Sequence, residues 1–285
     1  MLIVLLAVLS MLAQGASDFV YKKAQDRGIV LETYLLVEAV PFSAVALLFG
    51  ALRGGLHVNR ATVGFGLAFG VFSFIAIFLF VTSLREGEVG VNTLIFRLNF
   101  VLVAVLAILW LGEAWTASVG TGLFLAVLAI GVVTLWGRGG DRRPGSSRSV
   151  GLALVAMVFF AVLGVLFKIA MRAGANPGWA IVFAAASWSV CAAALVVARR
   201  RYAFPSNNWR FLPITGALKS FSFFLLLYAF RLGGSASVVV PIVQLSFLVT
   251  LLLAALVLRE PLTRPKLLGL ALAVAAIAAF SAQGA

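Results

Sequence analysis

The sequence is divided into ten long apolar stretches that are separated by short polar segments. A helix needs about 20 mainly apolar residues to cross the hydrocarbon core of a bilayer. In this chain 63% of the residues are hydrophobic and 11% are charged, which leaves too few polar side chains to cover a water-soluble globule. The sequence therefore predicts an all-α, multi-pass integral membrane protein. Ten transmembrane helices are expected, at residues 2–21, 30–52, 61–84, 89–111, 116–136, 150–171, 177–198, 209–231, 236–258 and 266–283.

The formal net charge is +13, but this excess does not indicate binding to nucleic acid. Lys and Arg are concentrated in the short segments between the apolar stretches, where they act as topology signals and contact lipid headgroups. Cys191 is the only cysteine and His57 the only histidine, so these residue types cannot form a metal-binding cluster. We expect no metal, no cofactor and no nucleic-acid partner. The expected partners are the lipid bilayer and a small-molecule substrate.

The second half of the sequence repeats the first at an offset of 147 residues. The segment Leu111–Thr116 (LGEAWT) aligns with Leu258–Thr263 (LREPLT), and Gly122 aligns with Gly269. Each half contains five helices, an odd number, so the second half begins on the opposite side of the membrane. Such an inverted-topology repeat is an arrangement that many secondary transporters use for alternating access. We assign residues 1–136 to the first repeat, 137–149 to a glycine- and arginine-rich linker, and 150–285 to the second repeat.

Two helix-turn-helix segments carry a resemblance to a known family. They are LGEAWTASVGTGLFLAVLAIGVV, which starts at Leu111, and LREPLTRPKLLGLALAVAAIAAF, which starts at Leu258. They resemble the drug/metabolite transporter superfamily, specifically its ten-helix EamA-type members, in which a glutamate closes the fourth and ninth helices. Glu113 and Glu260 hold those places here. The resemblance implies a secondary transporter with two inverted five-helix repeats around a central cavity, lined mainly by helices 1, 3, 4, 6, 8 and 9.

Membrane physics gives both of these glutamates a structural interpretation. Glu113 and Glu260 lie at helix ends, where a carboxylate reaches either water or the positive N-terminus of the next helix. We therefore expect them to stabilise helix ends and not to bind substrate.

The charge distribution and the family resemblance predict opposite orientations of the protein in the membrane. The segments that follow odd-numbered helices carry fifteen Lys and Arg residues, whereas those that follow even-numbered helices carry four. By the positive-inside rule, this bias places both termini outside the cell. The family resemblance implies that both termini lie in the cytoplasm. The sequence leaves this choice open.

Lys219 lies about halfway along the predicted helix 209–231, where a charge is costly unless it faces the protein interior or water. Thr215 and Ser222 lie on the same helical face, which predicts a polar stripe near the bilayer midplane. Transporters place their substrate sites at this depth. Tyr228 belongs to the aromatic residues of the same helix, some of which would stack on an apolar part of a substrate. The alternatives are a fixed ion pair for Lys219 and lipid-facing positions for the aromatic residues.

Arg97 lies well inside the predicted helix 89–111, with Asn92 and Asn99 on a broad polar arc around it. Gln244 is the repeat counterpart of Arg97. A guanidinium at this place is suited to clamp a carboxylate or a phosphate with two hydrogen bonds. The alternative is an ion pair between Arg97 and Glu38, which lies at a similar depth in the predicted helix 30–52.

Glu38 and Asp18 are the carboxylates inside the spans that lie away from the glutamates at the helix ends. They are the candidates for ion coupling, because a carboxylate in a membrane span can exchange a proton during transport. For Glu38, a structural pair with Arg97 and a functional role are equally supported. Asp18 shares a helical face with Gln14 and with Lys22, which would partly neutralise its charge.

Small residues and proline predict two local features of the packing. Gly66 and Gly70 form a GxxxG motif, which permits the close approach of another helix. Pro241 predicts a kink in the predicted helix 236–258 that frees a carbonyl beside Gln244 and is a candidate gate.

The leading functional hypothesis is a secondary transporter that moves a small polar metabolite by alternating access. An amino-acid-like solute is favoured, because buried Lys and Arg suit a carboxylate and phenylalanine-rich helices suit an apolar side chain. Export is the expected direction. The alternative substrates are phosphorylated or nucleotide-linked metabolites in exchange, and the alternative class is a structural membrane subunit or channel. An enzyme is not expected, because the spans contain no catalytic constellation. We expect a monomer or weak dimer in the plasma (inner) membrane of a prokaryote.

Overall fold

The chain folds into helices throughout the part that the structure describes. This computed structural model describes residues 1–25, 31–53, 58–87, 89–136, 147–200, 211–259 and 262–282. In these ranges no residue is in a β-strand, and ten segments are long and apolar enough to cross a membrane. The prediction of an all-α membrane protein with ten transmembrane helices is therefore confirmed. Most of the predicted linker and all of Glu260 lie outside the described residues.

The helical elements of the first half are α1 (Leu2–Gln25), α2 (Leu31–Arg53), α3 (Arg60–Glu86), α4 (Val89–Arg97), α5 (Asn99–Leu111), α6 (Ala117–Gly131) and the π-helical turn η1 (Val132–Trp136). Those of the second half are α7 (Ser147–Arg172), α8 (Pro177–Arg199), α9 (Leu212–Arg231), α10 (Ala236–Gln244), α11 (Ser246–Val257) and α12 (Arg264–Ser281).

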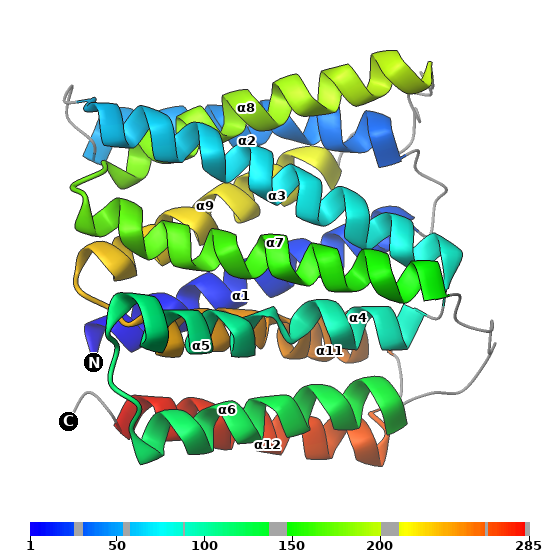
Figure 1. Ribbon diagram of the computed structural model, residues 1–285. Coiled ribbons are helices and arrows are strands. Elements are labelled where there is room, and N and C mark those ends of the chain that lie inside the picture. The colour runs from blue at the N-terminus through cyan, green and yellow to red at the C-terminus, as the bar shows by residue number, and fades with distance from the viewer. Residues whose placement is uncertain are drawn as a thin grey trace.

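Helix–helix packing repeats between the two halves, as the inverted repeat requires. Helix α1 packs against α9, α10 and α11, and its counterpart α7 packs against α3, α4 and α5. Helix α2 packs against α9, and α8 packs against α3. Two pairs, α2 with α8 and α6 with α12, pack each helix against its own counterpart, at opposite edges of the molecule (Figure 1).

The two faces of the molecule are distinguished by the chain ends. Helix α1 begins and α12 ends on one face, at the left of Figure 1, which we call the terminal face. The turn η1 ends and α7 begins on the opposite face, which we call the linker face. Helices α4 and α5 cross from the linker face to the terminal face, and α10 and α11 cross in the reverse direction.

The fourth and ninth spans each consist of two helices, whereas the sequence predicted a continuous helix for both. The breaks fall at Leu98, with φ −66° and ψ −1°, and at its repeat counterpart Leu245, with φ −74° and ψ 4°. The backbone oxygens of Leu98 and Leu245 each accept a hydrogen bond from the amide three residues later, as in a 3₁₀ turn. The donors are Val101 and Leu248, each at 3.0 Å. Pro241 removes one amide donor shortly before the second break, as expected from its sequence position.

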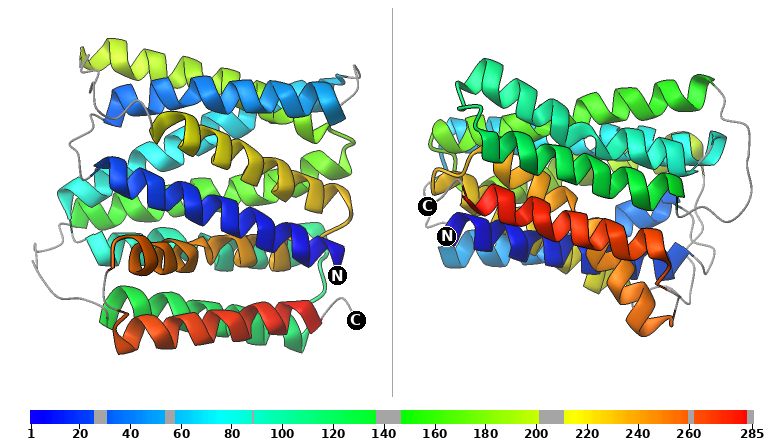
Figure 2. Two further views of the ribbon diagram at one scale, coloured as in Figure 1. Left: turned by 180° about the vertical axis from the view of Figure 1, so that it is seen from behind. Right: turned by 90° about the horizontal axis from the view of Figure 1, so that it is seen from below.

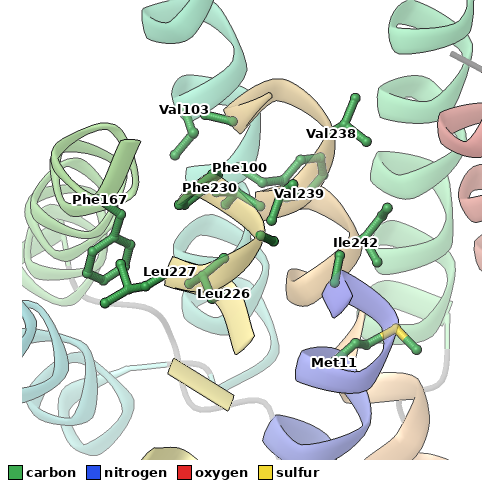
Figure 3. Close-up of a cluster of buried hydrophobic side chains, with 14 of the residues drawn as sticks. Met11, Phe100, Val103, Phe167, Leu226, Leu227, Phe230, Val238, Val239 and Ile242 are labelled. Carbon is green, nitrogen blue, oxygen red and sulfur yellow. The ribbon is translucent and has the colours of Figure 1, made fainter. Parts of the chain in front are cut away.

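The apolar core is concentrated toward the terminal face. Figure 3 shows a part of it that we call the terminal-face core, in which the labelled side chains come from α1, α5, α7, α9 and α10. Its labelled members are Met11, Phe100, Val103, Phe167, Leu226, Leu227, Phe230, Val238, Val239 and Ile242.

The two broken spans are packed unequally. Seven of the nine residues of α10 are buried, whereas in α4, its counterpart, only Asn92 and Phe96 are buried among residues 91–97. Helix α5 packs against α10, but α4 and α11 have no comparable packing in the described part of the chain. Figure 2 shows α11 turning away from its neighbours near the linker face. The molecule is therefore closed more tightly at the terminal face.

Glycines permit a close crossing between α3 and α8. A Cβ atom on Gly66 would lie 2.7 Å from the carbonyl oxygen of Ala180. A Cβ atom on Gly70 would overlap with the carbonyl oxygen of Ala184 and the hydroxyl of Ser187. The packing role predicted for this GxxxG motif is confirmed.

We predict that Gly70→Ala lowers the melting temperature of the purified protein, because the added methyl group forces α3 and α8 apart. Overpacking of this kind costs about 1–3 kcal/mol. Gly64→Ala is the matched control, because Gly64 lies on the same helix with nothing within 4 Å of an added Cβ. Equal melting temperatures for the two variants would contradict the close approach.

Candidate functional site

The two helix breaks meet at the centre of the molecule and bond to each other. The Nη1 atom of Arg97 donates to the backbone oxygen of Gln244 at 3.1 Å. The side-chain amide of Gln244 in turn donates to Oδ1 of Asn99 at 3.0 Å, and the Nδ2 atom of Asn99 donates to the backbone oxygen of Phe96 at 2.7 Å. Backbone groups that a helix break releases inside a membrane must find such partners, because no lipid can bond to them.

Asp18 of α1 lies beside this crossing. Its Oδ1 atom accepts a hydrogen bond from the side-chain amide of Gln14 at 2.9 Å, and Oδ2 accepts a weaker one from the hydroxyl of Ser246 at 3.5 Å. Electrostatic attraction reaches the carboxylate from both Arg97 and Lys219. Asp18 nevertheless forms no salt bridge within 4.0 Å with any described residue.

The guanidinium of Arg97 is likewise left without a carboxylate partner at salt-bridge distance in the described part of the chain. Besides its bond to Gln244, it lies over the ring of Phe247, 5.1 Å from the ring centroid. Arg97 and Asp18 therefore bond to neighbouring residues of the same break, Gln244 and Ser246, and form no direct ion pair with each other. Two half-buried, opposite charges in this arrangement form a place that a dipolar ligand can bridge.

Lys219 and Glu38 form an ion pair next to this place. The Nζ atom of Lys219 lies 3.0 Å from each carboxylate oxygen of Glu38, and its hydrogen bond goes to Oε2. The side chain of Glu38 is 4% exposed and that of Lys219 is 24% exposed, so the protein does not fully enclose the lysine side chain. The alternative that Glu38 pairs with Arg97 is thereby wrong, because the carboxylate turns to the lysine of α9.

Two of the predicted site residues join α9 to α1 and α2. The hydroxyl of Ser222 bonds to the hydroxyl of Ser10 at 2.9 Å, and both residues are buried. The hydroxyl of Thr215 bonds to that of Tyr34 at 2.8 Å. These polar groups are satisfied by neighbouring helices, as side-chain hydrogen bonds between membrane helices commonly are.

The other two predicted residues also lie apart from the central crossing. The Nδ2 atom of Asn92 donates to the backbone oxygen of Ser83 at 2.7 Å and joins α3 to α4. The ring of Tyr228 stacks on Phe224 with 5.9 Å between ring centroids. A substrate contact for either residue stays a prediction.

The structure adds residues that the sequence reasoning did not select. Ser246 bonds to Asp18, and Phe247 lies under the guanidinium of Arg97. Ser246 is the repeat counterpart of Asn99, so the offset of 147 residues would have pointed to it. No group of three or more His, Cys, Asp or Glu residues that could hold a metal ion occurs among the described residues.

The fold defines a multi-pass membrane protein built from an inverted repeat. Comparison with known families gives the narrower assignment: the EamA-like transporter family matches residues 1–135 and again residues 147–282. The chain belongs to this family and is a transporter of the drug/metabolite type. No curated protein matches the sequence. A crystal structure of another protein, 15% identical, has the same fold, with a TM-score of 0.81 over 99% of this chain and 96% of that one.

We predict that Glu38→Gln and Lys219→Met each lower the melting temperature, because each leaves the opposite charge in the membrane interior without its partner. Breaking a fully buried pair costs about 3–5 kcal/mol, and the partial exposure of Lys219 should reduce this cost. The double variant removes both charges and is expected to recover most of the stability. The matched control is Glu86→Gln, which breaks the exposed pair with Arg148 (3.4 Å) and should change little. Additive losses in the double variant would contradict the pairing.

Proposed function

We propose that this protein is a secondary transporter that moves an amino-acid-like zwitterion across the membrane by alternating access. The observation that carries the proposal is the arrangement of Asp18 and Arg97, two opposite charges that bond to Ser246 and Gln244 at the same helix break without a salt bridge to each other. In the proposed complex, the ligand's ammonium group approaches Asp18 and its carboxylate approaches Arg97.

Charge balance supports a zwitterion over a phosphorylated or nucleotide-linked metabolite. Two basic and two acidic side chains surround the centre, so their formal charges cancel. Because Lys219 and Glu38 neutralise each other, Asp18 and Arg97 remain for a ligand with one charge of each sign. A phosphate dianion would meet both carboxylates and would need a site with net positive charge. Phe247, beside Arg97, offers an apolar contact for a ligand side chain.

The proposal extends to direction, location and assembly. We propose that the protein exports its substrate, functions as a monomer or weak dimer, and lies in the plasma (inner) membrane of a prokaryote. The alternative of a channel or structural subunit predicts different behaviour in proteoliposomes. A carrier gives saturable exchange of a labelled amino acid, whereas a channel gives conductance without saturation in the same concentration range.

We predict that L-leucine or L-phenylalanine raises the melting temperature of the purified protein, and that analogues with one charge do not. Suitable analogues of leucine are 3-methylbutylamine, which lacks the carboxylate, and 4-methylpentanoate, which lacks the ammonium group. A ligand at about 100 times its Kd stabilises the native state by about 2.7 kcal/mol.

Asp18→Asn and Arg97→Gln are expected to abolish this response and transport, while the variants remain folded in detergent. The control is Ser189→Ala, which removes a hydroxyl that bonds to the backbone oxygen of Ala185 within α8, away from the crossing, and should keep the response to the amino acid. Stabilisation by the one-charge analogues, or normal uptake by both charge variants, would contradict the zwitterion site.

We further predict that the Glu38–Lys219 pair couples transport to the proton gradient. Glu38 is a carboxylate buried within a membrane span, and a carboxylate at such a place can exchange a proton during transport. The double variant Glu38→Gln/Lys219→Met keeps the charge balance but holds no carboxylate at this place. It is expected to lose accumulation driven by a pH gradient and to keep exchange between equilibrated proteoliposomes.

Two results would contradict this coupling. Uptake by the unmodified protein that ignores an imposed pH gradient would exclude proton coupling altogether. Continued accumulation by the double variant would exclude Glu38 and make Asp18 the next candidate.

A further inference from the structure

Glu113 caps a helix of the opposite half of the molecule. It follows the end of α5, where Gly112 adopts the left-handed conformation with φ 67°. Its Oε1 atom accepts a hydrogen bond from the backbone amide of Ala236 at 2.7 Å. Its Oε2 atom accepts bonds from the amide and the hydroxyl of Ser237, at 2.9 and 2.7 Å. The sequence suggested the next helix in the chain as its partner, whereas the partner is the N-terminus of α10.

A second contact crosses between the halves at the same face. The Nη1 atom of Arg172, at the end of α7, donates to the backbone oxygen of Leu111 at 3.0 Å. The end of α5 thus offers a carbonyl oxygen and a carboxylate, and the second half offers a guanidinium and the positive end of a helix. Charge-assisted hydrogen bonds of this kind are stronger than neutral ones. We call Glu113, Ser237 and Arg172 the latch.

Lys168 binds the turn between α9 and α10, which directly precedes the residues that Glu113 caps. Its side chain is buried, and its Nζ atom donates to the backbone oxygens of Gly233, at 3.2 Å, and of Gly234. These glycines connect α9 to α10. Lys168 therefore holds the carbonyl groups of the turn while Glu113 holds the amides that follow them, and the two side chains attract each other.

The latch lies directly next to the terminal-face core. Val238 and Val239 follow directly after the two residues that Glu113 caps, and both belong to this core (Figure 3). Val239 is 0% exposed. Separation of α10 from α5 would have to break the latch first and would then expose this apolar layer.

We propose that the latch holds the terminal face closed, and that its release opens this face during the transport cycle. This inference rests on the proposed alternating-access function. It differs from a purely structural cap, because every bond of the latch joins one half to the other and the halves are packed unequally. At the linker face, α4 and α11 have no packing comparable to that of α5 and α10 among the described residues. The structure corresponds to the state in which the latch is engaged.

The test measures the accessibility of a cysteine placed beneath the latch. Cys191→Ser removes the native thiol, and Val239→Cys introduces a thiol of similar size in the terminal-face core. The protein is reconstituted in lipid nanodiscs, where a charged methanethiosulfonate reagent reaches both faces and the rate of modification is measured. Glu113→Gln is expected to accelerate this rate about three- to ten-fold, because it removes the negative charge at the N-terminus of α10.

Arg172→Gln removes the second contact of the latch and is expected to accelerate the modification in the same direction. It also keeps the test decisive if Glu113→Gln does not fold. Glu86→Gln is the control, because Glu86 also joins the halves through a salt bridge, with Arg148 of α7, but is placed at the end of α3 on the linker face. It should leave the modification rate of Val239→Cys unchanged.

A folded Glu113→Gln variant with an unchanged modification rate would overturn the proposal. Hydrogen exchange identifies that outcome as a local cap, because only the amides of Ala236 and Ser237 would then exchange faster. The measurement needs no substrate. Its failure is therefore distinguishable from failure of the proposed carrier function, which would appear as conductance without saturation in proteoliposomes.

Discussion

Inside a bilayer, every backbone group that leaves a helix needs a partner within the protein, and the centre of this molecule depends on that constraint. The breaks at Leu98 and Leu245 release backbone groups in the middle of two spans. Arg97, Asn99 and Gln244 satisfy part of this demand by bonding across the crossing. The same side chains bring polar chemistry to the bilayer midplane. The residues that satisfy the backbone groups at the breaks thus also contribute to the proposed ligand site.

Much of the architecture follows from patterns within single segments. Apolar length predicts the ten spans, the offset of 147 residues predicts the inverted repeat, and the GxxxG motif predicts that another helix approaches α3 closely. The spans and the motif depend on residues that are neighbours in the chain or lie on one helix face, and the repeat depends only on a comparison of two parts of the sequence. They could therefore be derived before any contact between distant segments was known.

The partners of the charged residues could not be derived in this way. Glu38 pairs with Lys219, at a sequence distance of 181 residues, and its depth in the membrane was equally compatible with Arg97. Glu113 caps α10, 123 residues away, although the helix that follows it in sequence was the nearer candidate. Depth along a span limits which charges can meet, but the lateral order of the helices decides between them. The break at Leu98 was missed because no proline or glycine marks it.

Arg97 and Gln244 are separated by 147 residues and touch each other, so the internal pseudo-two-fold axis passes between them. If the halves were separate identical chains, an isologous interface would place the same residue twice at this point. Two arginines there would repel each other, and two glutamines would supply no charge. A single polypeptide removes this restriction, since duplicated positions can diverge independently. An arginine on one side of the axis and a glutamine on the other is an arrangement that two identical chains related by this axis could not have.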